Sequence, residues 1–438
     1  MKRIIHDKLR AWKDSRNRKP LILQGARQVG KSYILKKFGE KDFPVCHVFN
    51  FEHDKQRLSS TFEPDLDANR IINDLSIISG KKINPKNDLV IFDEIQECPD
   101  AMTSLKYFCE DKPELHLCCA GSLIGVKMSP KSFPVGKVNY LDMYPMTFEE
   151  FLHALNDELA LESFYSCKKI HRQSKVAHNK LWEILKEYYV TGGMPEVIFS
   201  YIQKRKTRLD AMETARSVQQ EIINSYFKDF AKHSGKTNSM HIVAVLENVP
   251  MQLSKYIDSS VKRYKFKGII PGKKSFAEIQ GPVEWLEKAG IIIKIKLCNK
   301  AEIPLESFCK NNIFKLFVFD IGILGCMLDL PVKSILAEDY GITKGYFAEN
   351  FVAQEFLASG AFKQYSWTER NSEIEFLKVI DGSIVPIEVK SGQRTQAKSL
   401  RQYIKKYSPE KAIKITGKSL EVINDIVVNY PLYLAGII

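Results

Sequence analysis

A glycine-containing segment near the N-terminus has the residue types of a phosphate-binding loop. Residues 25–32 read GARQVGKS and fit the pattern G-x-x-x-x-G-K-[ST]. Two glycines allow backbone conformations in which successive N–H groups point at phosphate oxygens. The Lys31 ammonium can reach the β- and γ-phosphates, and the Ser32 hydroxyl can ligate magnesium. The sequence thus predicts binding of ATP and Mg²⁺, with a nucleotide site made of Gly25, Ala26, Arg27, Gln28, Val29, Gly30, Lys31, Ser32 and Tyr33.

Two adjacent carboxylates follow the apolar run Leu89–Phe92. A buried strand that delivers two carboxylates at its carboxyl end is costly without a cation. We expect Asp93 to hold magnesium together with Ser32, and Glu94 to orient and polarise the attacking water. Glu94 and Lys31 are therefore the predicted catalytic residues. A helix cap is the alternative role for an isolated Asp-Glu pair.

A serine follows a third apolar run, LHLCCAG at 115–121. At that place Ser122 could touch the γ-phosphate or the attacking water, as a sensor residue. A serine after Gly121 is equally compatible with a turn or a cap.

These residues require an α/β framework to bring them together. Apolar strand patterns alternate with helix-length segments over residues 1–150, which predicts a parallel sheet with helices on both faces. Residues 151–334 have mostly helical patterns. Residues 335–438 begin with a helix and continue with two strands joined by Asp381-Gly382, a strong hairpin signal. We predict a domain for each of these three blocks.

Composition sets broad limits on the class of protein. The chain has 438 residues, 44% of them hydrophobic and 27% charged, a balance that excludes a wholly disordered chain. No apolar run is long enough to cross a membrane, and the charged start lacks the apolar core of a signal peptide. We therefore expect a cytoplasmic protein without a membrane partner, whose nine scattered cysteines are buried free thiols. A net charge of +13 favours an acidic partner such as nucleic acid, although a basic solvated surface is the alternative.

Several segments, in order, resemble one family of prokaryotic P-loop ATPases of the AAA+ superfamily. They are GARQVGKS, VIFDEIQ, CAGSLIG, PVGKVNYLDMYPMTFEEF and YYVTGGMPEVI. FKLFVFDIGILGCML, GYFAENFVAQEF and PIEVKSG resemble the uncharacterised C-terminal domain, DUF4143, that accompanies this ATPase domain, AAA_14. The resemblance implies an AAA+ ATPase core, a helical and winged-helix middle, and a C-terminal domain similar to the PD-(D/E)xK (restriction-endonuclease-like) nucleases. Since AAA+ relatives often act as rings, it also suggests a homo-oligomer.

One departure from the family concerns its arginine. Relatives usually carry Gly-Arg where this chain has Gly136-Lys137. If that arginine acts on the γ-phosphate, lysine is a poor substitute because it lacks the planar fork. Either ATP turnover is slow or another arginine acts.

The C-terminal block holds a candidate nuclease site made of Glu349, Glu375, Glu388 and Lys390. Glu388 and Lys390 share one face of a strand, and Glu375 lies on the preceding strand. Together these groups could bind Mg²⁺ and activate a water for phosphodiester cleavage. Glu375 replaces the family's usual aspartate, so a metal could be misplaced. Polar residues alternating on an exposed strand are the alternative.

The middle block contains a basic stretch, VKRYKFKGIIPGKK at 261–274. With the helix predicted at 276–289 and the strand at 291–298, its order fits a DNA-binding winged helix. Tyr264 and Phe266 could stack on bases or sit in the core. The alternative is a solvated basic face that contacts proteins.

Three functions follow from these features. The first is an ATPase that couples Mg-ATP hydrolysis to a nucleic-acid transaction. The second is a nucleotide-gated nuclease that uses the C-terminal domain. The third is a nucleotide switch that docks protein partners without significant turnover.

Overall fold

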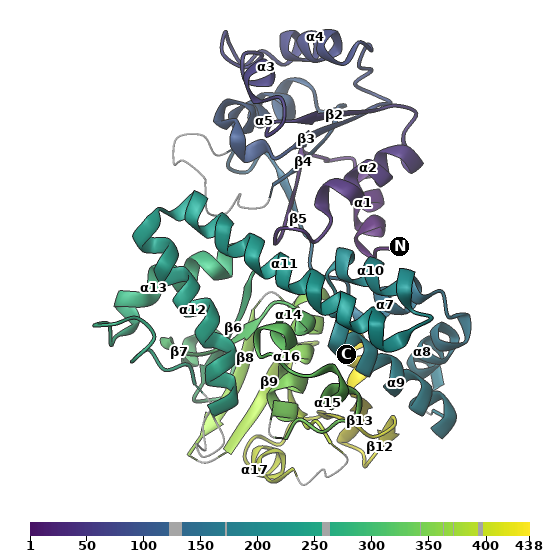
Figure 1. The fold of residues 1–438 in the computed structure, drawn as a ribbon, viewed down its shortest axis with the longest axis vertical. Helices are drawn as coiled ribbons and strands as arrows, with labels where there is room; N and C mark the ends of the chain where they lie inside the picture. Colours follow the sequence, from purple (N-terminus) through teal and green to yellow (C-terminus); the bar gives the residue numbers. More distant parts are fainter. Residues whose placement is uncertain are drawn as a thin grey trace. The chain divides into compact units, whose positions relative to one another are not determined.

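The computed structural model describes residues 1–121, 134–170, 173–255, 263–341, 343–361, 363–370, 372–392 and 397–438 (Figure 1). The chain divides into an N-terminal unit, Lys2–Tyr144, and a C-terminal unit, Pro145–Ile438. Within the described ranges, no helix is long and apolar enough to cross a membrane.

The N-terminal unit is built on a five-stranded sheet in the order β2-β3-β4-β1-β5. All neighbouring strands are parallel. Four of these strands fall where the apolar runs predicted them, which confirms a parallel α/β sheet. The strands are β1 (Leu21–Gln24), β2 (Cys46–Asn50), β3 (Leu89–Asp93), β4 (His116–Ala120) and β5 (Asn139–Asp142).

Helices cover both faces of this sheet because alternate side chains of a strand point to opposite faces. Val90 and Phe92 of β3 pack in one apolar cluster with residues of α4 and α5. Gly39 of α2 approaches Leu89 on the other face. The helices are α1 (Ile5–Lys13), α2 (Lys31–Asp42), α3 (Lys55–Ser59), α4 (Ala68–Ser79), η1 (Ile95–Glu97) and α5 (Pro99–Asp111).

The C-terminal unit begins with a run of helices. The first, α7, starts at a capping box in which Thr147 and Glu150 satisfy each other's backbone N–H groups. The helices are α7 (Phe148–Leu155), α8 (Glu158–Ile170), α9 (Lys175–Thr191), α10 (Pro195–Lys204), α11 (Arg208–Ser234), α12 (Lys236–Lys255), α13 (Phe276–Lys288), α14 (Ile321–Met327), α15 (Val332–Leu336), α16 (Thr343–Ala358) and α17 (Lys398–Tyr407).

An eight-stranded mixed sheet completes this unit, in the order β12-β13-β11-β10-β9-β8-β6-β7. Its predicted hairpin is confirmed: β9 and β10 are antiparallel and joined by Asp381 and Gly382, which have φ values of 49° and 81°. The strands are β6 (Ile292–Cys298), β7 (Cys309–Val318), β8 (Gln364–Glu369), β9 (Ser372–Ile380), β10 (Ser383–Val389), β11 (Ala412–Thr416), β12 (Glu421–Val422) and β13 (Val427–Pro431); the short helices η2 (Leu305–Phe308) and η3 (Leu432–Ile437) lie among them.

The segment expected to form a winged helix contributes to this sheet. Helix α13 is followed by the antiparallel pair β6–β7, as a wing would be. However, β6 also pairs in parallel with β8, so both strands belong to the C-terminal sheet. Tyr264 is buried and its ring stacks on Phe314 with centroids 6.0 Å apart, which places it in the core.

Candidate nucleotide site

The loop between β1 and α2 has a backbone that requires glycine at two positions. Gly25 has a φ of 148°, and a Cβ atom there would lie 2.1 Å from the carbonyl oxygen of Met143. Gly30, the N-cap of α2, has a φ of 95°. Both glycines of the motif therefore shape a loop that ends at a helix N-terminus, a position that favours anions.

Lys31 is the first residue of α2, and its ammonium is bound to carbonyl oxygens of the loop. Its Nζ donates to the oxygens of Gly25 and Ala26 at 2.9 and 2.8 Å. The residue is only 6% exposed, and burial lowers the pKa of Lys31 to about 8, although the nearby Glu94 raises it. A buried ammonium with only neutral ligands would gain stability from phosphate oxygens.

The two residues predicted to hold magnesium are in contact. Ser32 Oγ donates to Asp93 Oδ1 at 2.7 Å, and Asn50 Nδ2 lies 3.2 Å from the other carboxylate oxygen. Asp93 is 4% exposed, so its charge is held away from bulk water. A hydroxyl and a carboxylate are oxygen ligands of the kind Mg²⁺ prefers, and the remaining positions suit waters and phosphate oxygens. The residues present therefore fit a magnesium ion bound with a nucleotide.

Glu94 follows β3 in a left-handed backbone conformation, with φ of 53° and ψ of 43°. Gln96 Nε2 donates a hydrogen bond to the Glu94 carboxylate. The other amide atom, Gln96 Oε1, is buried without a hydrogen-bond partner in the described residues. The hydrogen bond from Gln96, a residue of η1, fixes the position of the Glu94 carboxylate.

Two residues of this site were missed by the sequence reasoning. Asn50 lies opposite Asp93 in the register of parallel strands β2 and β3. The sequence feature that could have identified it is a polar residue at the carboxyl end of a neighbouring strand. Arg3 is buried and donates to the carbonyl oxygens of Val29 and Tyr144 at 3.1 and 2.7 Å. These hydrogen bonds connect the phosphate loop to the first residues of the chain. No local sequence pattern predicts this role for Arg3.

Two other positions lie outside this cluster of contacts, and a third is not described. Ser122 lies outside the described residues. Tyr33 is 53% exposed on α2. Lys137, which stands in place of the family's arginine, makes a surface ion pair with Glu110 at 2.9 Å.

The structure brings three of the four C-terminal candidates together. Lys390 Nζ lies 3.1 Å from a carboxylate oxygen of Glu375 and 3.1 Å from one of Glu388. The remaining oxygens accept backbone N–H groups, from Val389 to Glu375 at 3.1 Å and from Leu400 to Glu388 at 3.0 Å. Burial, with the neighbouring Glu375, raises the pKa of Glu388, although Lys390 lowers it.

The fourth candidate, Glu349, lies beside a different lysine. Its carboxylate is 3.3 Å from the buried Lys315, which also forms an ion pair with Glu373. Within the described part of the chain, no group of three or more acidic, histidine or cysteine residues is arranged to hold a metal ion. The two carboxylates of the hairpin instead share an ion pair with Lys390.

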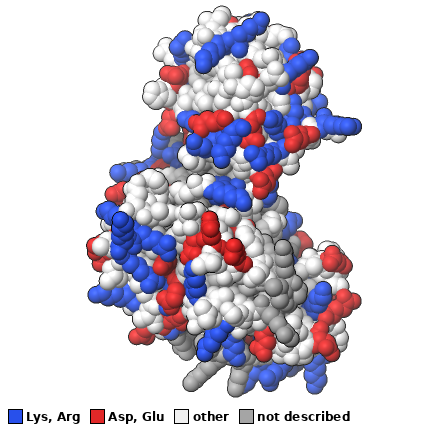
Figure 2. All heavy atoms as spheres, turned by 90° about the vertical axis from the view of Figure 1, so that its right-hand side faces the viewer, with Lys and Arg blue, Asp and Glu red and all other residues white. Residues whose placement is uncertain are grey.

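The basic stretch keeps several lysines at the surface. Lys265, Lys267 and Lys274 are exposed, whereas residues 261 and 262 lie outside the described residues. On the face drawn in Figure 2, basic and acidic side chains are interspersed.

Comparison with known proteins assigns the N-terminal part of the chain. Residues 17–152 match the family model of an AAA domain. Residues 183–334 and 344–434 match two domains of unknown function, DUF8612 and DUF4143. A search of curated proteins finds no match.

Three solved structures that match this chain are distant from it in sequence. The Walker-type ATPase PABY2304 of Pyrococcus abyssi is 16% identical over 74% of this chain and 95% of its own, with a TM-score of 0.47. Orc1 of Aeropyrum pernix, solved in complex with DNA, is 11% identical over 77% and 93%, with a TM-score of 0.28. RuvB of Thermotoga maritima is 11% identical over 72% and 90%, also with a TM-score of 0.28. With TM-scores below 0.5, none of their functions is transferred to this chain. The phosphate loop on its parallel sheet and the matched segment together identify residues 17–152 as an AAA-type P-loop ATPase domain.

Proposed function

We propose that this ATPase binds Mg-ATP at residues 25–33 and hydrolyses it by in-line attack of a water that Glu94 orients. The contact of 2.7 Å between Ser32 Oγ and Asp93 Oδ1 is the observation that carries the proposal. It joins the hydroxyl after the loop lysine to the carboxylate at the end of β3, where a divalent cation would sit beside the phosphates. Magnesium, when bound, would neutralise charge on the β- and γ-phosphates.

The chain's own residues supply binding and orientation. Lys31 would exchange its two carbonyl partners for phosphate oxygens, which its burial makes favourable. Glu94 would accept a hydrogen bond from the attacking water, while Gln96 holds the carboxylate in place. Lys137, which stands where relatives usually carry arginine, is paired with Glu110. A lysine also lacks the planar fork of the arginine that completes such sites. We propose that a second copy of the chain contributes it, in a homo-oligomer.

The test is steady-state ATP hydrolysis by the full chain with Mg²⁺, alongside nucleotide binding measured by calorimetry. Lys31→Ala should abolish both binding and turnover. Glu94→Gln should keep binding and lower kcat by about two to four orders of magnitude. The exposed Glu63→Gln in the same unit is the matched control. Binding without any turnover in the wild type would refute hydrolysis and favour the nucleotide switch.

Nucleic acid is the partner we propose for the exposed lysines of the basic stretch. The net charge of +13 and the exposed Lys265, Lys267 and Lys274 support it. Replacing these three lysines with glutamine should weaken DNA binding and flatten its salt dependence. The same change at the exposed Lys81, Lys82 and Lys86 is the control. Equal losses in both triple variants would mean that total charge, rather than this surface, attracts DNA.

Phosphodiester cleavage is a second candidate function, favoured by the contact of Lys390 with Glu375 and Glu388 at 3.1 Å. A metal ion would have to displace Lys390 from at least one carboxylate. The test is cleavage of plasmid DNA with Mg²⁺ or Mn²⁺, with and without ATP. Loss of cleavage in Glu388→Ala, with ATP turnover intact, would support it. Uncut DNA with the wild type under all these conditions would exclude it.

A further inference from the structure

Two cysteines face each other at one end of the β6–β7 pair in the C-terminal unit. Cys298 is the last residue of β6 and Cys309 is the first of β7, and the register of these antiparallel strands pairs them directly. Their Sγ atoms are 2.6 Å apart. The two thiols also lie 3.5 and 3.3 Å from the carbonyl oxygen of Leu305. Neither the nucleotide site nor the Glu375–Lys390 cluster uses either thiol.

The backbone at this pair has the spacing of a disulfide. Directly paired residues of antiparallel strands have Cα atoms about 4.5–5.5 Å apart. Disulfides form at Cα separations of about 4.4–6.8 Å, with an S–S bond of about 2.05 Å. Since Cys298 and Cys309 are such a pair and their sulfurs are already in contact, a bond between them requires only a small side-chain movement.

The two thiols differ in exposure and in acidity. Cys298 is 0% exposed, whereas Cys309 is only partly buried, so a small oxidant has access to Cys309 first. The hydrogen bond with Cys298 lowers the pKa of Cys309, and Lys296 lowers it too, although burial and Glu306 raise it. The same hydrogen bond raises the pKa of Cys298, and burial raises it further. Cys309 is therefore the thiol that more readily becomes a thiolate, which is the nucleophilic form.

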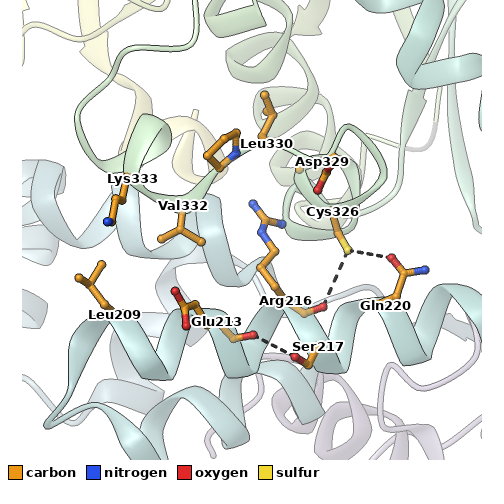
Figure 3. Close-up of a pocket in the computed structure, with 12 residues that line it drawn as sticks. Leu209, Glu213, Arg216, Ser217, Gln220, Cys326, Asp329, Leu330, Val332 and Lys333 are labelled. Carbon is orange, nitrogen blue, oxygen red and sulfur yellow. Dashed lines mark hydrogen bonds between the residues drawn. The ribbon is translucent and has the colours of Figure 1, made fainter.

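Cys326 provides a contrast, because it is partly exposed but has no such partner. It lines a cavity of about 520 Å³ between α11 and the chain that runs from α14 to α15, and the lining residues drawn in Figure 3 include no second cysteine. Its Sγ lies 3.9 Å from the carbonyl oxygen of Arg216 and 3.7 Å from Gln220 Oε1. Burial raises the pKa of Cys326, although Arg216 lowers it. Partial exposure alone therefore does not make a thiol reactive in this chain.

We propose that Cys298 and Cys309 are a reversible oxidation site, which a hydroperoxide converts into a disulfide. In the first step the Cys309 thiolate attacks one oxygen of hydrogen peroxide, the O–O bond breaks, and the other oxygen leaves as hydroxide. Cys309 is then a sulfenic acid. In the second step the Cys298 sulfur attacks the Cys309 sulfur, and the hydroxyl of the sulfenic acid leaves with the Cys298 proton as water. Protonation of the hydroxide completes the balance: two thiols and one peroxide give one disulfide and two waters.

The disulfide would close the segment 299–308, which includes η2, into a covalent loop. This segment is already part of the core, because Ala301 and Leu305 belong to the same apolar cluster as Cys298 and Trp367. A bond across its ends restricts the unfolded chain while leaving this packing in place. Oxidation should therefore stabilise the C-terminal unit, and a dithiol reductant should reverse the effect.

The test is a peptide map of the full chain, reduced first and then treated with hydrogen peroxide. Free thiols are blocked with iodoacetamide, and the chain is digested with trypsin without reductant. Cleavage after Lys296, Lys300 and Lys310 places the two cysteines on separate peptides, 297–300 and 301–310. We expect these peptides to be joined, to separate after dithiothreitol, and the oxidised chain to unfold at a higher temperature than the reduced chain. Alkylated Cys298 and Cys309 after peroxide treatment, or an overoxidised Cys309 beside a free Cys298, would overturn the proposal.

Three variants test the roles of the individual thiols. In Cys298→Ala, Cys309 should accumulate as a sulfenic acid that dimedone traps, because the second thiol is missing. In Cys309→Ala, the buried Cys298 should stay unoxidised. Cys326→Ala is the matched control and should form the joined peptides at the wild-type rate. In the wild type, Cys309 should be oxidised about tenfold or more faster than Cys326. Equal rates would refute the activation of Cys309, and the wild-type map reports this whether or not the variants fold.

Discussion

Ser32 and Asp93 come from different elements, the first turn of α2 and the last residue of β3, and their side-chain oxygens lie 2.7 Å apart. The parallel sheet makes this possible, because the carboxyl ends of β1 and β3 reach the same edge. The helix that follows β1 begins at the loop, so its first hydroxyl faces the end of β3. A cation bound there would bridge the loop and the sheet.

Replacing Ser32 tests this bridge. Ser32→Ala removes a hydroxyl that donates to Asp93 and leaves a buried carboxylate short of a partner. We expect kcat/KM for Mg-ATP to fall by about ten- to hundredfold. Ser32→Thr keeps the hydroxyl and the motif, and should retain activity. Similar turnover in the alanine and threonine variants would contradict a role for the hydroxyl.

The approach of Gly25 to Met143 gives a second prediction. In Gly25→Ala, the new Cβ would lie 2.1 Å from a backbone oxygen that cannot move aside without shifting β5. We expect nucleotide binding to be lost and the N-terminal unit to be destabilised by about 1–3 kcal/mol. Calorimetry with ATP and hydrogen exchange over residues 21–42 measure the two effects.

The control for this variant separates a clash from backbone strain. Gly80, the C-cap of α4, has a φ of 67°, but a Cβ atom there would meet nothing within 4 Å. Gly80→Ala should therefore cost only about 1 kcal/mol and leave ATP binding unchanged. Wild-type ATP affinity in Gly25→Ala would show that the loop tolerates a side chain there.

A buried carboxyl predicts how the stability of the C-terminal unit depends on pH. Glu355 is 2% exposed, and its Oε1 accepts the Phe148 N–H at 3.0 Å. Burial raises the pKa of Glu355 to about 8, although the Phe148 N–H lowers it. Between the ordinary pKa of about 4.5 and this value, the folded state keeps a proton that the unfolded state has released. The free energy of unfolding therefore falls as pH rises through this window, by at most about 1.4 kcal/mol per pH unit from this group.

Glu355→Gln removes this contribution. The unfolding midpoint of the variant, relative to that of the wild type, should increase as pH rises from 5 to 8. Tryptophan fluorescence is a suitable probe, because Trp182, Trp285 and Trp367 all lie in the C-terminal unit. Glu410→Gln, which changes an exposed carboxylate, should show the same pH dependence of the unfolding midpoint as the wild type. A constant difference between Glu355→Gln and wild type across this range would refute the raised pKa.

Sequence patterns were sufficient where the determinants are local. Strand β1 and the loop after it follow from the apolar run and the spacing of Gly25 and Gly30. The β9–β10 hairpin follows from Asp381-Gly382, because only such residues accept positive φ at both central positions of the turn. In each case a few neighbouring residues decide the backbone.

Contacts between distant residues could not be predicted in this way. Arg3 donates to the carbonyl oxygen of Tyr144, which is 141 residues away in the sequence. The pairing of Ile295 with Gln364 puts the expected wing into the C-terminal sheet. Buried charges such as Lys315 depend on partners from several elements, and their arrangement is set by packing rather than by any one pattern.

Gln96 gives the last prediction, because its contact with Glu94 separates orientation from binding. Its Nε2 donates to the proposed base, and its own Oε1 is buried without a partner in the described residues. Gln96→Ala should leave the affinity for ATP unchanged, since the loop and Ser32 are untouched, and should lower kcat by about ten- to hundredfold. Gln96→Asn keeps the amide on a shorter side chain, and its kcat should lie between those of the wild type and Gln96→Ala. Binding and single-turnover hydrolysis, measured on the same samples, distinguish these effects. A loss of ATP affinity with kcat preserved would show that Gln96 supports the loop instead of Glu94.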